Sequence, residues 1–145
     1  MTLTTTASLK RILASIKDGT HGTFARVDEG YPLLSAKNVH DGQLRIGEDE
    51  SQVSETDFRS IVANGYPQRN DVLLTIVGTI GRSCVFEHDG PAAFQRSVAF
   101  LRPKSTVNSR YVAYLTQSAA FQDELALATK SAAQGGVYMG DVWKA

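Results

Sequence analysis

The sequence contains one residue with strong nucleophilic chemistry, the single cysteine Cys84. A reactive thiol needs a depressed pKa, which a helix N-terminus or a basic neighbour can provide. Arg82 stands two positions away, on the same face of the strand that Ser83–Phe86 is expected to form. A free cysteine in a strand is usually a small buried hydrophobe. We therefore predict that Cys84 is buried; a hydrolase that pairs it with a distant histidine is the weaker alternative.

Other motifs that could carry chemistry are incomplete. The histidines His21, His40 and His88 are far apart, and none has a metal-ligand spacing to a neighbour. Gly78–Arg82 has the glycines of an anion-binding loop but lacks the Lys-Ser/Thr end of a P-loop. No serine lies in a Gly-x-Ser-x-Gly elbow. We expect no catalytic centre and no metal, and interpret Gly78–Arg82 as a hairpin turn that presents Arg82.

Side chains that can bond to DNA form the remaining group of candidates. Residues of the types that bind phosphates and base edges occur in or beside the predicted loops. Loops are polar in most proteins, so composition alone leaves DNA binding open. The candidates are Thr20, His21, Lys37, Asn38, His40, Arg82, Arg96 and Gln134.

The charge balance limits what these side chains can achieve alone. Fifteen basic residues balance fifteen acidic ones, whereas an autonomous DNA-binding domain usually has a basic excess. Glu48–Glu50 form one acidic run, with Glu55 and Asp57 shortly after, so a basic face elsewhere is still allowed. A neutral total predicts modest affinity unless partners supply more charge.

Length and composition fit one cytoplasmic domain. The 42% apolar content of the 145 residues suffices for a single core. No apolar run approaches the ~18 residues that a membrane helix needs. Met1–Thr6 lacks the basic start and apolar stretch of a signal peptide. We expect a single domain over residues 1–145.

Helical spacing of apolar residues occurs in four segments. Gly19 is expected to end the first helix in the left-handed conformation, and Gly65 with Pro67 to end the second. The segments are Leu9–Ile16, a helix beginning near Ser54, Tyr111–Ala119 and Phe121–Ala128.

Extended segments are expected between these helices. Asp71–Val77 is a nearly continuous apolar run, which predicts a strand buried on both faces. Asp41-Gly42 predicts a tight turn between two extended pieces. The pattern predicts one α+β domain with a twisted, largely antiparallel sheet flanked by short helices. The other expected strands are Tyr31–Leu34, Ser83–Phe86 and Arg96–Arg102.

Six short motifs occur in an order that resembles a known family. Each motif is weak alone, and the six in this order and spacing are fairly specific. From about Leu9 to Val142, the chain resembles the target-recognition domain of type I restriction-modification specificity subunits. The motifs are Asp18–His21, Pro32–Gly42, Asp71–Thr75 with Gly78–Gly81, Gln95–Ala99, Tyr111–Leu115 with Phe121-Gln122, and Ala132–Val137.

The resemblance implies a division of labour. In that family, each specificity subunit carries two such domains joined by long spacer helices, and each domain reads one half of a split double-stranded DNA site. Partner modification (methyltransferase) subunits methylate an adenine in each half using S-adenosylmethionine, and a restriction subunit uses ATP. The resemblance therefore implies that this chain is no enzyme and binds no cofactor. The spacer helix and second domain are absent from the 145 residues, which leaves assembly with methyltransferase subunits open.

The resemblance also implies that the loops face the major groove of DNA. Segments least like the family pattern, Gln43–Ser54 and Ala63–Asn70, are expected to carry sequence choice. A degenerate recognition domain that binds only protein is the alternative. Expected phosphate or guanine contacts are Lys37, Arg82 and Arg96, and expected hydrogen bonds to bases or backbone come from Thr20, His21, Asn38 and Gln134.

Overall fold

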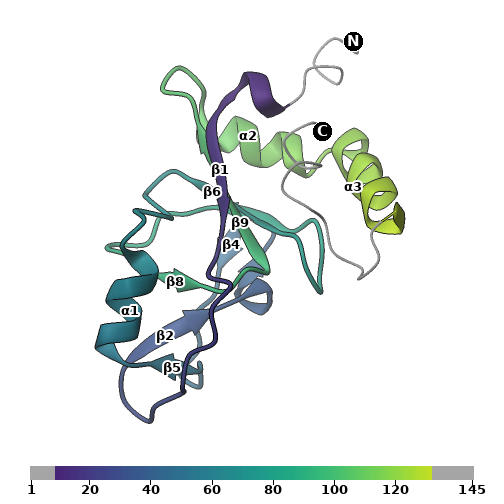
Figure 1. Ribbon diagram of the computed structural model, residues 1–145. Coiled ribbons are helices and arrows are strands. Elements are labelled where there is room, and N and C mark those ends of the chain that lie inside the picture. The colour runs from purple at the N-terminus through teal and green to yellow at the C-terminus, as the bar shows by residue number, and fades with distance from the viewer. Residues whose placement is uncertain (1–8, 132–145) are drawn as a thin grey trace.

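The computed structural model describes residues 9–131 and has the predicted α+β class. Figure 1 shows a strand-rich centre with two helices, α2 (Ser109–Thr116) and α3 (Ala119–Ser131), at one end. The helix α1 (Glu55–Val62) lies at the other end. None of the helices in residues 9–131 is long and apolar enough to cross a membrane.

The main sheet has four antiparallel strands in the order β1-β9-β6-β7. The strands are β1 (Leu13–Asp18), β9 (Val98–Pro103), β6 (Val72–Thr75) and β7 (Ser83–Val85). Every residue of β6 is buried, because β6 is a central strand and is covered on both faces. The predicted double burial of this apolar run is confirmed.

Alternation along β6 separates the two largest clusters of the hydrophobic core. Val72 and Leu74 belong to the cluster that includes Phe121 of α3. Leu73, between them, belongs to the cluster that contains Phe94 and Phe100. Successive side chains of a strand point to opposite faces, so one strand contributes to both clusters.

A smaller three-stranded sheet has the order β5-β2-β8. Its β2 and β8 strands run parallel, the one exception to antiparallel pairing among the strands of residues 9–131. Helix α1 packs on this sheet, and the Phe58 ring stacks on the Tyr31 ring with 4.4 Å between centroids. The strands are β5 (Gln52–Val53), β2 (Tyr31–Leu34) and β8 (Ala93–Phe94).

The predicted Asp41-Gly42 turn is confirmed. It joins the short strands β3 (Val39–His40) and β4 (Gln43–Leu44), which pair in antiparallel fashion. Gly42 has a φ of +80°, a conformation that glycine adopts without steric cost. A short 3-10 helix, η3 (Ala36–Asn38), precedes this hairpin.

The predicted helix over Leu9–Ile16 is wrong. Only Leu9–Arg11 are helical, in the short 3-10 helix η2, and β1 begins at Leu13. The exposed edge of β9 offers backbone hydrogen bonds that a helix here would leave unmade, and β1 takes them from Leu13 to Asp18. Tertiary pairing therefore overrides a local helical period.

Gly19 has a different role from the predicted helix stop. A Cβ atom at this position would lie 2.1 Å from the Gln95 carbonyl oxygen and 2.3 Å from that of Phe94. Glycine is needed because β1 ends in close contact with the chain between β8 and β9.

The other predicted helices are confirmed. Ser54 caps α1 by accepting a hydrogen bond from the Asp57 backbone N–H at 3.1 Å. The C-terminal helical region is divided into α2 and α3, and Ser118 separates them. The Ser118 hydroxyl accepts a hydrogen bond from the Phe121 N–H at 3.2 Å, which favours the start of the new helix.

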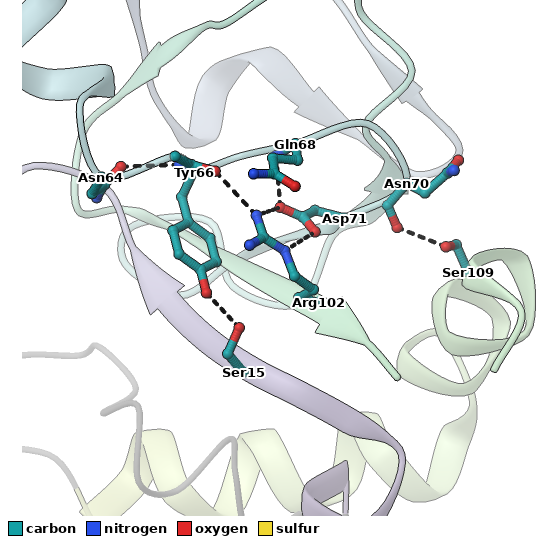
Figure 2. A network of polar contacts seen from close by, with 9 residues as sticks. Ser15, Asn64, Tyr66, Gln68, Asn70, Asp71, Arg102 and Ser109 are labelled. Carbon is teal, nitrogen blue, oxygen red and sulfur yellow. Dashed lines mark hydrogen bonds and ion pairs between the residues drawn. The ribbon is translucent and has the colours of Figure 1, made fainter. Parts of the chain in front are cut away.

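A polar network locks the main sheet to the segment before β6 (Figure 2). Arg102 of β9 binds both carboxylate oxygens of the buried Asp71, at 2.9 Å each. Its guanidinium also lies 3.9 Å from the centroid of the Tyr66 ring and donates to the Gly65 carbonyl at 3.1 Å. The Tyr66 hydroxyl in turn lies 2.5 Å from Ser15 Oγ of β1. The network joins two strands and a loop by polar contacts.

Candidate nucleic-acid interface

Two candidate segments meet at the end of β1. Thr20 forms an isolated parallel bridge with Gln95, and its N–H donates to the Phe94 carbonyl at 2.8 Å. The Arg96 N–H donates to the Thr20 carbonyl at 3.1 Å. The predicted candidates Thr20 and Arg96 are therefore neighbours in space, although they are far apart in sequence.

The short helix η3 joins this pair to the β6–β7 turn. The Ala36 N–H donates to Ser97 Oγ at 2.9 Å, next to Arg96. The Ala36 carbonyl accepts a hydrogen bond from Arg82 Nη2 at 3.2 Å. Both backbone groups of one residue thus tie the Arg96 segment to Arg82, and Lys37 follows directly in the chain.

The β3–β4 hairpin is fastened to the same turn. Asp41 Oδ1 accepts a hydrogen bond from the Ser83 N–H at 3.1 Å, and the Gly42 N–H donates to the Ser83 carbonyl at 2.9 Å. These contacts bring His40 and Arg45 near Arg82. We call the resulting set the basic rim, which consists of Thr20, Lys37, His40, Arg45, Arg82 and Arg96.

Three arginines of the basic rim have no acidic partner within residues 9–131. They are Arg45, Arg82 and Arg96. Arg45 and Arg96 are exposed, and Arg82 is half-buried. The fourth cation, Lys37, forms an ion pair with Glu50. Unpaired guanidinium groups are well suited to bind phosphate oxygens or a guanine edge.

Arg82 is anchored on one side only. Its Nη2 is held by the Ala36 carbonyl, and its backbone N–H donates to Thr75 Oγ1 at 2.9 Å. Its Nε is buried and has no hydrogen-bond partner among the described residues. A buried donor without a partner is energetically unfavourable. A ligand acceptor that reorients this guanidinium would give Nε a hydrogen bond and remove that cost.

The electrostatics at His40 reflect the density of positive charge. Burial lowers the pKa of His40, and the nearby Arg45 and Arg82 guanidinium groups lower it further, against an opposing effect of Asp41. His40 is therefore neutral at pH 7, and a neutral imidazole can both donate and accept a hydrogen bond.

Asn38 does not fit its expected role as a DNA contact. The residue is only 2% exposed. Its Oδ1 accepts a hydrogen bond from the Ser35 N–H at 3.0 Å, and its Nδ2 donates to the Arg45 carbonyl and to Glu50 Oε2, each at 2.9 Å. The side-chain amide is occupied in shaping the chain, because it closes the loop that contains Arg45.

His21 and Gln134 complete the predicted set. The His21 side chain is 62% exposed, and its Nε2 lies 2.7 Å from Asp18 Oδ2. It follows Thr20 and so stands beside the basic rim, with a carboxylate that orients its ring. Gln134 lies outside the described residues.

Arg45 is the rim residue that sequence reasoning missed. It falls inside Gln43–Ser54, one of the two segments predicted to carry sequence choice, but no motif distinguishes it from other exposed arginines. Its importance becomes visible only when the hairpin is folded against Ser83.

The predicted burial of Cys84 is confirmed. The residue is fully buried in β7 and has no disulfide partner. Burial, with smaller effects of Asp41 and Glu87, raises the pKa of the thiol to about 12. At pH 7 the thiolate fraction is negligible, so the geometry does not favour the cysteine hydrolase alternative. Among residues 9–131, no three His, Cys, Asp or Glu side chains come together as a metal site.

No protein-family model matches the chain, and no curated protein matches its sequence. Solved structures resemble it in fold. The HsdS subunit from Thermoanaerobacter tengcongensis has a TM-score of 0.59 at 16% sequence identity. The type I restriction-modification S subunit from M. genitalium has a TM-score of 0.58 at 12% identity.

A third solved structure, from work on complex assembly and conformational transition of the type I R-M system, has a TM-score of 0.63 at 17% sequence identity. Each of the three comparisons covers 96% of this chain. The chain spans only 31% to 32% of the length of these proteins. The predicted likeness to specificity subunits is therefore confirmed at the level of the fold, for about a third of such a subunit.

Proposed function

We propose that this chain recognises one half of a split double-stranded DNA site as part of a type I restriction-modification system. One observation carries the proposal: a fold shared with three type I restriction-modification structures, two of them S subunits, brings unpaired arginines from three segments together in the basic rim. Clustered cations next to amide and hydroxyl groups are the chemistry that binds phosphates and base edges.

The proposed role is recognition without catalysis. The chain would position a partner methyltransferase subunit at an adenine, and that partner would bind S-adenosylmethionine. A restriction subunit would use ATP. The buried thiol supports this assignment, because Cys84 is not available as a nucleophile at neutral pH.

Within this proposal, the candidate residues have distinct tasks. Arg82 and Arg96 would contact phosphates or guanine, and Lys37 would do so if phosphate replaces Glu50 as its partner. Thr20 and His21 would hydrogen-bond to the backbone or to bases. Gln134 keeps its proposed role as a hydrogen-bonding residue.

Weak binding by the isolated chain is expected. The formal net charge is zero, and a half-site offers few contacts. Non-specific affinities are roughly 10⁻⁴ to 10⁻⁶ M at physiological salt, and we expect little better here. Tight binding would require the charge of the partner subunits and a second recognition domain.

The direct test is selection from a random duplex library at low salt, first with the chain alone and then with its methyltransferase subunit. The bound DNA is recovered and sequenced. Enrichment of a motif of a few base pairs, lost as salt rises, is the expected result. If neither condition retains DNA, the chain is better described as a module that binds only protein.

A pair of double variants tests whether the basic rim is responsible. Arg82→Ala with Arg96→Ala should abolish retention of the motif. Arg59→Ala with Arg110→Ala removes the same charge from exposed ion pairs outside the rim and should leave the motif intact. Equal losses in both variants would mean that binding responds to total charge and not to the rim.

A further inference from the structure

The chain that leaves the β3–β4 hairpin is held in place at both ends. The Arg45 N–H donates to the Asn38 carbonyl at 2.8 Å, and the Arg45 carbonyl accepts from Asn38 Nδ2 at 2.9 Å. Two residues later, the Gly47 N–H donates to Glu50 Oε2 at 2.8 Å. The same carboxylate oxygen accepts from Asn38 Nδ2 at 2.9 Å. Arg45-Ile46 is therefore a short segment between fixed points.

The clamp that fixes this segment is largely shielded from solvent. Asn38 is 2% exposed, and the Glu50 side chain is 7% exposed. Hydrogen bonds to a shielded carboxylate are stronger than bonds between neutral groups. A segment fixed in this way loses little conformational entropy when it binds a ligand, which favours specific recognition.

The two side chains in the clamped segment face outward. Arg45 is exposed, and its side chain has one hydrogen bond, from Nε to Gln43 Oε1 at 3.3 Å. Both terminal nitrogen atoms are thus without a partner within the described part of the chain. Ile46 is 40% exposed, one of few large apolar side chains that the structure leaves in contact with water.

The exposed Arg45 and the exposed Ile46 are adjacent, so this surface offers a charged donor and an apolar side chain together. A phosphate group offers no apolar surface that an isoleucine side chain could contact. The major groove, in contrast, presents a bidentate acceptor pair on guanine and an apolar 5-methyl group on thymine. Arg82 lies close by, because Asp41 and Gly42 of the hairpin form hydrogen bonds with the next residue, Ser83. Arg82 can bind a phosphate of the DNA backbone and so position Arg45 and Ile46 against the bases.

We propose that Arg45 and Ile46 determine sequence specificity, with Arg45 binding a guanine and Ile46 contacting the 5-methyl group of a nearby thymine. This inference rests on the proposed function. Asn38 and Glu50 are positioning residues, because they hold the segment and do not touch the DNA.

The test compares motifs selected from a random duplex library by the wild-type chain and by Arg45→Ala, Ile46→Ala and Arg59→Ala. Each selection uses the chain alone and the chain with its methyltransferase subunit. Arg45→Ala should lose the preference for guanine at one position by about tenfold or more. The control Arg59→Ala removes an exposed arginine of α1 and should select the wild-type motif.

A second measurement isolates the methyl group. The selected duplex is synthesised with deoxyuridine in place of thymine at each position of the motif, which removes only the 5-methyl group. The wild-type chain should bind one of these duplexes about fourfold more weakly, the effect of one buried methyl group. Ile46→Ala should bind the thymine and deoxyuridine duplexes equally.

The outcomes separate this inference from the function on which it rests. If the wild-type chain enriches no motif under either condition, the proposed function fails, and the inference fails with it. If a motif is enriched but Arg45→Ala weakens all sequences alike, Arg45 is a phosphate contact and the inference is overturned. If every deoxyuridine duplex binds the wild-type chain as tightly as the thymine duplex, the role of Ile46 is overturned. Because both side chains are exposed, thermal unfolding of the variants should match the wild type.

Discussion

Arg102 lies near the end of β9 and Arg96 lies two residues before its start, and their guanidinium groups have opposite surroundings. Arg102 binds both oxygens of Asp71, the Gly65 carbonyl and the face of the Tyr66 ring. Arg96 is exposed and has no acidic partner among the described residues, and the half-buried Arg82 has none either. The same functional group is thus engaged by the fold in Arg102 and available for binding in Arg96.

The comparison shows how one sheet separates stability from binding. A buried carboxylate such as Asp71 requires its cation, so Arg102 is committed to the fold. An exposed arginine contributes little to stability and is free to bind an anion. The clamp formed by Asn38 and Glu50 combines both roles. It stabilises the fold, and it also fixes the position of Arg45 in the basic rim.

The largest expected effect on stability comes from Arg102, the arginine that the fold engages. Arg102→Ala leaves the carboxylate of Asp71 buried without its partner and should lower the free energy of unfolding by about 3 kcal/mol. This corresponds to a decrease in Tm of roughly 10 °C for a domain of this size. Urea denaturation and calorimetry measure both quantities.

The matched control is Arg110→Ala, whose ion pair with Glu87 is exposed. This substitution should lower the free energy of unfolding by less than about 1 kcal/mol. Similar losses in the two variants would mean that Arg102 contributes no more to stability than an exposed arginine.

Asn38→Ala should come next, with a loss of about 2 kcal/mol in the free energy of unfolding. The reason is that Ser35, Arg45 and Glu50 each lose the hydrogen-bond partner that the buried Asn38 side chain provides. Urea denaturation again provides the measurement. Asn64→Ala serves as the control, because Asn64 is exposed and accepts one hydrogen bond. A variant of Asn38 with unchanged stability but altered base preference would restore the residue as a direct DNA contact.

The clamp should also make stability depend on pH. The hydrogen bond from Lys37 holds the pKa of Glu50 below its ordinary value of 4.5, with further help from Gly47 and Asn38 and against the effect of burial. A carboxyl with a lowered folded-state pKa contributes its full stability above the ordinary value and loses it as the pH falls through the folded value. The stability difference between the wild type and Glu50→Gln should therefore narrow below about pH 4.5. A difference that is constant from pH 7 to pH 3 would contradict this prediction.

The smallest effect on stability is expected for Arg96, the arginine without an acidic partner. Arg96→Ala should change the free energy of unfolding by no more than about 0.5 kcal/mol. Its effect on DNA binding is separate: the slope of log K against log salt should decrease by about one, as expected for one lost phosphate contact. Binding titrations at several salt concentrations measure the slope. A loss restricted to one base position would identify Arg96 as a base contact instead.

Much of the local structure could be predicted from the sequence. Ser54 as a helix cap, the Asp41-Gly42 turn and the buried run at β6 depend on neighbouring residues and are confirmed. The burial of Cys84 is also confirmed, as expected for a free cysteine in a strand.

Other features could not be predicted, because they depend on partners that are distant in the sequence. The helical period of Leu9–Ile16 is real, but β9 offers a strand edge that no local pattern reveals. Asn38 has the polar side chain of a surface loop, and only the fold places Arg45 and Glu50 around it.

Local sequence patterns were therefore enough to predict the α+β class, the Asp41-Gly42 turn, the Ser54 cap and the set of basic residues from which a binding surface could be made. Which of those cations are free of an acidic partner depends on the folded chain. Arg102 and Arg96 carry the same group, and nothing near them in the sequence shows that Asp71 binds the one and not the other. The physical reason is that an ion pair depends on distance and burial, and both are set by the packing of segments far apart in the chain.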